Sequence, residues 1–215
     1  EHQQPLVAYE MHRSRYELYF SILKGRSGPS EIRDEVISFI ADSESEAPPP
    51  IHIFCRYVNG VSGVENIARV ICNDKNNNLR VGIFSGEAPK NFSIDDPIKW
   101  LNQPITCVIE DYDKHYKPYV QSLWKAGKLD VIVTTKAFGM GVNKSNVRRT
   151  LHAGMPSSME AFYQEAGRAG RDRHNANCDM LFTPEPDDAQ KLFESLEKDN
   201  SPENMEAVTS SVSRS

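Results

Sequence analysis

The chain has 215 residues, of which 39% are hydrophobic, and this is enough to bury the core of one domain with attached segments. Its formal net charge of −5 at pH 7 excludes the global basic character of a nucleic-acid coat protein, but not a local stripe that contacts phosphates. The four cysteines lack zinc-ligand spacing, and no membrane-span or signal-peptide pattern is visible, so we expect an intracellular protein without zinc, secretion or membrane insertion.

The first half of the chain predicts helices that alternate with short apolar strands. Helical spacing of apolar residues predicts helices over 13–24 (Tyr16, Tyr19, Phe20, Leu23) and over 32–40 (Ile32, Val36, Phe39, Ile40). A buried strand is expected at 51–55, and Ser62 with Glu65 predicts a capping box that opens the next helix. Another apolar strand follows at 81–85.

The second half continues the alternation after an irregular, proline-containing stretch at 88–111. One helix face is predicted from Tyr116, Tyr119, Val120, Leu123 and Trp124, and it closes at Gly127. Strands are expected at 131–135, 149–152 and 178–183. Ser157 with Glu160 predicts a second capping box, 187–198 a last helix, and 199–215 a disordered polar tail. This order predicts an α/β fold, with a mostly parallel sheet covered by helices on both faces.

A first candidate site follows the strand at 131–135, because ligands of such sheets bind outside the carboxyl ends of the strands. Between Thr135 and Lys144 the loop holds Gly139, Gly141 and Asn143. The glycines would let backbone amides approach an anion, and the flanking residues would add a hydroxyl and a positive charge. The alternative is an ordinary strand-to-helix loop, since the third glycine of a dinucleotide fingerprint is missing.

The second candidate site is QEAGRAGRD, residues 164–172, inside the predicted helix that begins near Ser157. Two glycines in a helix each cost about 1 kcal/mol relative to alanine, and two arginines three residues apart repel each other. Gln164, Gly167, Arg168 and Arg171 would line one stripe of that helix. The glycine would permit close approach, and the guanidinium groups suit phosphate oxygens. The alternative is a solvated surface helix.

Both stretches resemble motifs of superfamily-two helicases. QEAGRAGRD resembles motif VI, VIVTTKAFGMGVNK at 131–144 is similar to motif V in its RecQ form, and 51–71 resembles motif IV. The strong part of the resemblance covers 129–198. Within it, Arg173 replaces a usual glycine, and Ser85-Gly86-Glu87 lacks the histidine of the corresponding family turn.

The resemblance implies a three-layer RecA-like domain, and only the second motor lobe, because no G-x-x-x-x-G-K-[ST] is present. We expect 1–26 to enter from the interlobe junction and include the first helix. The helicase C-terminal domain is expected over 27–198, with an insertion at 88–111, and the tail over 199–215.

The implied function is that of a 3′–5′ RecQ-type DNA helicase in repair and recombination, with ATP and Mg²⁺ held mainly by a first lobe. Arg171 would be the arginine finger on the γ-phosphate, with Arg168 beside it and Gln164 orienting the site. Gly167 would lie at the nucleotide together with the glycines and asparagine of the first candidate loop.

Thr135, Lys144 and Ser85 would contact the backbone of single-stranded or forked DNA. The other implied partner is the first RecA-like lobe of the same protein. A eukaryotic protein of this kind would be nuclear, and otherwise cytoplasmic. Two alternatives stay open: a superfamily-two motor acting on RNA or chromatin, and a non-catalytic lobe that binds nucleic acid or a partner.

Overall fold

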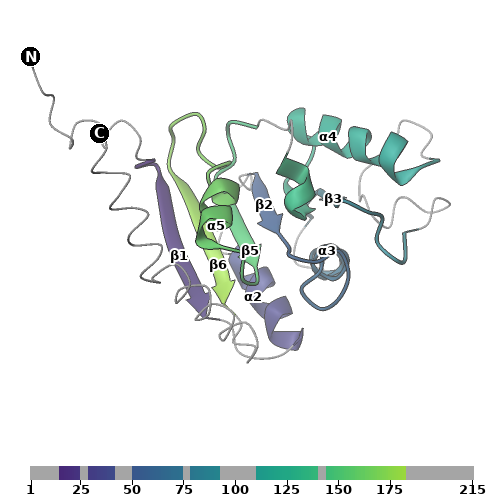
Figure 1. The fold of residues 1–215 in the computed structure, drawn as a ribbon, viewed down its shortest axis with the longest axis horizontal. Coiled ribbons are helices and arrows are strands. Elements are labelled where there is room, and N and C mark those ends of the chain that lie inside the picture. The colour runs from purple at the N-terminus through teal and green to yellow at the C-terminus, as the bar shows by residue number, and fades with distance from the viewer. Residues whose placement is uncertain are drawn as a thin grey trace, which may run out of the picture.

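Six strands form one sheet in the order β1-β6-β5-β2-β4-β3, and every pair of neighbours is parallel (Figure 1). The strands are β1 (Leu18–Lys24), β2 (Ile51–Phe54), β3 (Val81–Phe84), β4 (Val131–Thr134), β5 (Arg149–Ala153) and β6 (Ala176–Phe182). The computed structural model describes residues 15–24, 29–41, 50–74, 78–92, 110–139 and 144–182. The predicted strands in the middle and second half of the chain are confirmed.

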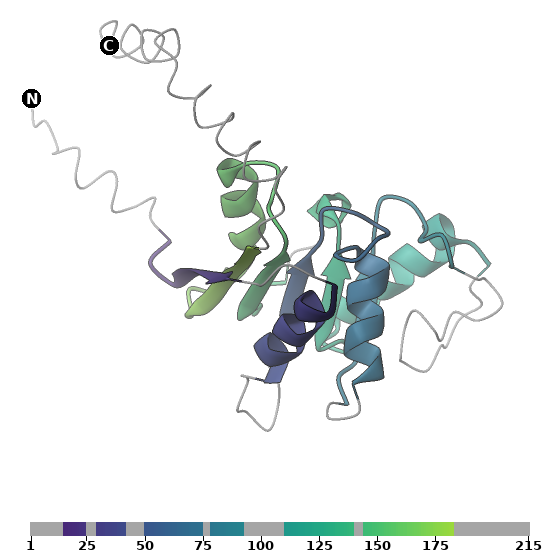
Figure 2. The same cartoon turned by 90° about the horizontal axis from the view of Figure 1, so that it is seen from below.

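Helices cover both faces of this sheet. They are α2 (Pro29–Ala41), α3 (Val64–Asn73), a π-helical turn (Tyr112–Tyr116) that runs into α4 (Lys117–Lys125), a 3₁₀-helix (Lys136–Gly139) and α5 (Met159–Ala166). Figure 2 shows α2 and α3 on one face and α5 on the other. The three-layer α/β arrangement predicted from the sequence is confirmed.

Alternation along β2 divides the core between the two faces. Ile51 and Ile53 are fully buried, and alternation places them on the face opposite to His52. His52 and Phe54 are also buried, but they point to the α4 and α5 side, where His52 lies against the Trp124 ring with centroids 6.2 Å apart. The two faces of one strand therefore carry different chemistry.

The helix predicted over 13–24 is wrong, because Leu18–Lys24 forms β1, an edge strand paired with β6. The same residues also alternate, with Phe20 and Ile22 on one side and Tyr19 on the other. Aromatic and β-branched residues suit a pleated surface, and pairing with β6 decides between the two periods.

Both predicted capping boxes are misplaced by one residue. α3 begins after Gly63, which makes no side-chain cap, and a Cβ there would lie 2.5 Å from the Asn59 carbonyl. α5 begins after Ser158, whose hydroxyl accepts the Ala161 N–H at 3.0 Å. The close approach of Asn59 therefore requires glycine at the first helix, and a neighbouring serine caps the second.

Several predictions lie outside the described residues: most of the proposed insertion at 88–111, the helix at 187–198 and the tail at 199–215. The domain boundaries stay predictions. Among the helices that the structure describes, none has the length and apolar character needed to cross a lipid bilayer.

Candidate nucleotide and nucleic-acid site

The stretch QEAGRAGRD is a helix end followed by a tight turn. α5 stops at Ala166, and the N–H of Gly167 donates to the Tyr163 carbonyl at 2.8 Å. Gly170 has a φ of +57°, and an added Cβ would lie 2.8 Å from the His174 carbonyl oxygen. The prediction of one helical stripe is therefore wrong beyond Ala166, because the glycines end the helix and shape the turn.

This turn lies at the amino end of β5. The N–H of Gly170 donates to the Val147 carbonyl at 2.9 Å, and that of Asp172 donates to the Ser145 carbonyl at 3.3 Å. Both acceptors lie in the short segment that leads into β5. This second candidate site thus lies away from the carboxyl ends of the strands, where ligands of such sheets bind, since α5 carries the chain back along the sheet before the turn.

Arg15, just before β1, fixes the end of α5. Its guanidinium donates to the carbonyl oxygens of Gly167 at 3.0 Å and Ala169 at 2.7 Å, and it also pairs with Glu17. A helix leaves its last carbonyls without intrahelical donors, and a cation is favoured there. One side chain from the start of the described chain thus braces a turn about 150 residues later in the sequence.

Two further ion pairs hold the turn. Asp172 accepts a bidentate pair of hydrogen bonds from Arg148, one of them at 2.9 Å, and this holds the pKa of Asp172 well below its usual range. Arg173 has a φ of +66° and lies 3.5 Å from Glu17. The position that departs from the family's glycine therefore keeps the left-handed backbone that glycine favours.

The two arginines of the stretch have different surroundings. Arg168 is half-buried, and its pKa is lowered by burial and then by the charge of Arg171, while Glu165 opposes the shift. Arg171 is exposed. Gln164 is exposed too, and its amide donates to Glu160 at 2.8 Å. Arg171 is thus the more exposed of the two arginines.

The end of β4 lies next to that of β3. The N–H of Thr135 donates to the Phe84 carbonyl at 3.1 Å, and Thr135 is buried. Ser85 is fully buried, with its hydroxyl 2.6 Å from the Tyr112 hydroxyl. Burial also raises the pKa of Tyr112 to about 12. A DNA contact by Ser85 stays a prediction, and it would require this hydroxyl pair to open.

Lys144 lies away from Thr135. Its Nζ is 5.2 Å from the centroid of the Trp124 ring, and an added Cβ at Gly127 would lie 3.9 Å from it. Gly127 follows α4 and leads into the amino end of β4, and Ser145 contacts the arginine turn. Lys144 therefore lies near QEAGRAGRD, toward the amino ends of the strands, whereas Thr135 lies at the carboxyl end of β4.

The other predicted loop residues are only partly described. Gly139 ends the 3₁₀-helix, while Gly141 and Asn143 lie outside the described residues. In the part of the chain that the structure describes, no three His, Cys, Asp or Glu side chains gather as a metal site.

Sequence reasoning missed Arg15 and two buried histidines, His52 and His152. Strand alternation in IHIF and TLHA places one inward histidine on each of β2 and β5, which was a usable signal. The adjacency of those strands was not visible, because their order depends on long-range pairing.

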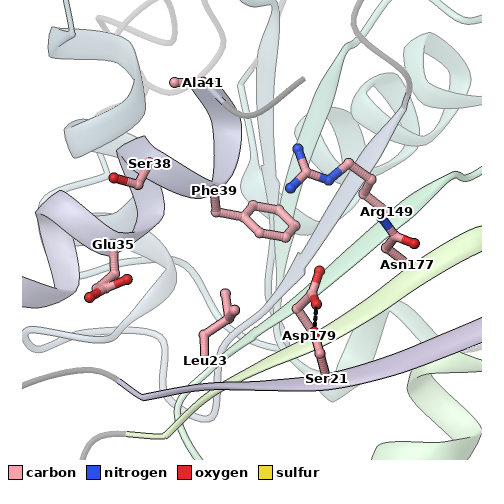
Figure 3. Close-up of a pocket in the computed structure, with 9 residues that line it drawn as sticks. All are labelled: Ser21, Leu23, Glu35, Ser38, Phe39, Ala41, Arg149, Asn177 and Asp179. Atoms are coloured by element: carbon pink, nitrogen blue, oxygen red, sulfur yellow. Dashed lines mark hydrogen bonds between the residues drawn. The ribbon is translucent and has the colours of Figure 1, made fainter. Parts of the chain in front are cut away.

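A cavity of about 640 Å³ lies on the α2 side of β1, β5 and β6 (Figure 3). Asp179 accepts a hydrogen bond from Ser21 inside it, and the Arg149 guanidinium lies 3.9 Å from the centroid of the Phe39 ring. None of the predicted site residues lines this cavity. The candidate site is on the other face of the sheet.

Residues 31–173 match the family described as the helicase conserved C-terminal domain. The chain belongs to this family. The two motifs predict a likeness to RecQ helicases, and the sequence relatives of this helicase C-terminal domain confirm it. ATP-dependent DNA helicase RecQ of Bacillus subtilis is 57% identical over 58 residues, which are 27% of this chain and 10% of that protein. ATP-dependent DNA helicase Q1 of Mus musculus is 48% identical over 66 residues, 31% of this chain and 10% of that protein.

Solved structures show the fold of this helicase C-terminal domain to be that of RecA-like helicase domains. Mss116p bound to ssRNA and AMP-PNP matches with a TM-score of 0.58 at 16% identity, over 85% of this chain and 30% of that one. Domain 2 of the DEAD-box helicase Mss116p bound to an RNA duplex matches with a TM-score of 0.56 at 17% identity, over 86% of this chain and 60% of that one. The matched stretch spans about a tenth of the length of the two sequence relatives above.

Proposed function

We propose that this chain is the second motor lobe of a RecQ-type, ATP-dependent 3′–5′ DNA helicase that acts in repair and recombination. The observation that carries the proposal is the pair of arginines on a turn braced by Arg15, Arg148 and Asp172. A rigid turn with an exposed guanidinium suits a group that reaches across to a nucleotide on another lobe. The proposed partners of this chain are the first RecA-like lobe of the same protein and single-stranded or forked DNA. We place a eukaryotic form in the nucleus and any other in the cytoplasm.

The charge of the turn fits a nucleotide triphosphate. Arg168 and Arg171 lie close enough for the second charge to lower the pKa of the first. An anion between them would relieve that repulsion, and desolvation around Arg168 would strengthen the attraction. ATP with Mg²⁺, held mainly by the first lobe, would supply the phosphoryl group whose transfer to water drives the motor.

In this mechanism Arg171 neutralises negative charge that develops on the transferred phosphoryl group, as an arginine finger does. Arg168 sits beside it, and Gln164 orients the site. Gly167, at the helix end, allows the close approach. Gly139, Gly141 and Asn143 are proposed to lie at the nucleotide from the loop after β4.

Single-stranded DNA is proposed to be gripped by Thr135 at the end of β4, while Lys144 contacts a further part of the DNA strand. Backbone contacts of this kind carry no base information, which suits a motor that must move along any sequence. We expect weak binding by the chain that falls steeply with salt, because each phosphate contact releases counterions. Thr135→Ala and Lys144→Ala should lower affinity for all sequences alike.

An RNA motor is the second candidate, since the two Mss116p structures compared above are bound to RNA. The test uses a protein in which a first RecA-like lobe precedes this chain, with ATP hydrolysis measured against single-stranded DNA and RNA of one sequence. Stimulation by DNA and not by RNA supports the RecQ assignment, and the reverse overturns it. The chain alone should hydrolyse no ATP. If the two-lobe protein is also inactive, the lobe is a non-catalytic binding module.

A further inference from the structure

A continuous row of side chains, buried except for the partly exposed Glu165, crosses the sheet beneath α5. We call this row the histidine ladder: Thr134, His52, Phe54, His152 and Glu165, from β4 through β2 and β5 to α5. Phe54 stacks on His52 at 3.8 Å and on His152 at 4.7 Å between ring centroids. The ladder exists because β2 pairs with both β4 and β5, so that their inward residues lie side by side.

One end of the ladder meets the chain that leaves β4. Nε2 of His52 lies 2.8 Å from Oγ1 of Thr134, and both side chains are buried. The His52 ring also meets the ring of Phe138, in the 3₁₀-helix, edge-on at 5.3 Å. Burial, then the positive charge of Arg168, holds the pKa of His52 well below its usual range, so the ring stays neutral.

The other end of the ladder meets the arginine turn. Nε2 of His152 lies 2.9 Å from Oε2 of Glu165, and the ring of Phe162 packs against His152 edge-on at 4.8 Å. Glu165 stands in the last turn of α5, and its charge acts directly on Arg168. The carbonyl of Glu165 also accepts the Arg168 N–H at 3.1 Å.

Hydrogen bonds between buried polar groups are directional, whereas a row of aliphatic side chains could shift without losing any specific contact. Each hydrogen bond of the ladder fixes one partner only when the other is in place, and an unpaired buried group is unfavourable. A displacement of Thr134 would therefore displace His52. The stacked rings would transmit that displacement to His152, and the hydrogen bond of His152 would transmit it to the Glu165 carboxylate beside Arg168. The ladder joins the two parts of the candidate site, which lie at opposite ends of the strands.

We propose that His52 and His152 are positioning residues, which couple the backbone after β4 to the placement of the Arg168–Arg171 turn. The proposal rests on the proposed function, in which the chain after β4 grips nucleic acid and the turn serves the nucleotide. Nucleic acid bound at the carboxyl end of β4 would thereby orient the arginines at the amino end of β5.

The test follows the backbone amide resonances of Gly167, Arg168 and Ala169 in the 215-residue chain, on titration with a single-stranded thymidine oligonucleotide. We expect the oligonucleotide to shift them. His152→Phe keeps the stacked ring and removes the bond to Glu165, so the response should fall about fivefold or more, with oligonucleotide affinity nearly unchanged.

Three further variants make the test decisive. Glu165→Ala removes the same bond from a partly exposed position and should act alike even if His152→Phe folds poorly. Glu165→Gln keeps an acceptor for His152 and should restore the response. His115→Phe, at an exposed histidine outside the ladder, should match the unsubstituted chain.

The outcomes separate the two proposals. A response that survives in both His152→Phe and Glu165→Ala would mean that the oligonucleotide reaches the turn directly, and the coupling would be wrong while the nucleic-acid function stands. Binding with no response in the unsubstituted chain would also overturn the coupling. No oligonucleotide binding at all, at low salt, would overturn the proposed function and the coupling with it.

Discussion

The two faces of the sheet are both buried but differ in chemistry. On the face away from His52, three strands present Ile53 and its paired residues Val133 and Leu151, all fully or almost fully buried. Toward α4 and α5, the adjacent positions carry His52, Thr134 and other polar residues that are equally buried. The first face needs only close packing, whereas the second needs hydrogen-bond partners in fixed places. The proposed function is thus assigned to the face toward α4 and α5.

The largest change in stability is expected on the aliphatic face. Ile53→Ala removes a fully buried side chain between β4 and β5, and it should lower the free energy of unfolding by about 2–5 kcal/mol. Urea denaturation followed by circular dichroism measures this. The folded fraction should keep the oligonucleotide response of the arginine turn. Loss of that response at full folding would mean that both faces serve the site.

A smaller loss is expected where glycine shapes the turn. Gly170→Ala places a Cβ at a φ of +57° and 2.8 Å from a backbone oxygen, so we expect about 1–3 kcal/mol of destabilisation. Arg173→Gly is the matched change, because it removes a Cβ from the same left-handed region. It should leave stability within about 1 kcal/mol of the parent chain. Equal losses in both variants would contradict the backbone explanation.

Stability should depend on pH through the polar face. In the unfolded chain His52 binds a proton when the pH falls below the ordinary histidine pKa of about 6.5. In the folded chain its ring stays neutral. The unfolded state then holds more protons, so stability falls as pH drops below about 6.5, by at most about 1.4 kcal/mol per pH unit from this group. His52→Gln should flatten the slope between pH 7 and 5. An unchanged slope would assign it to other groups.

Much of the fold could be predicted from local pattern, and the failures have physical causes. The strand at 131–135 is an uninterrupted β-branched run and that at 51–55 is largely apolar, and both predictions are confirmed. The residues from Leu18 to Lys24 fit two periods, and only the partner strand β6 decides between them. Local propensity thus loses to tertiary pairing at a sheet edge.

The composition of the candidate site can be proposed from its motifs, but its arrangement cannot be predicted from them. The motif residues of QEAGRAGRD were identified, yet the bonds that place them come from Arg15 and Arg148, distant in sequence. The histidine ladder depends on the spatial order of β5, β2 and β4, which alternation along one strand cannot reveal. The left-handed backbone at Arg173 could be anticipated, because the family favours glycine there.

The most direct test of the account replaces Arg171 in a protein that carries a first RecA-like lobe before this chain. We predict that Arg171→Ala lowers DNA-stimulated ATP hydrolysis by about 10³-fold or more, with DNA binding and thermal stability nearly unchanged. Arg171→Lys keeps the charge but not the planar fork and should also be severely impaired. Arg173→Ala, at an exposed arginine two residues away, is the control and should retain most of the activity. Normal hydrolysis by Arg171→Ala, or its unfolding, would contradict the assignment of this turn to the nucleotide.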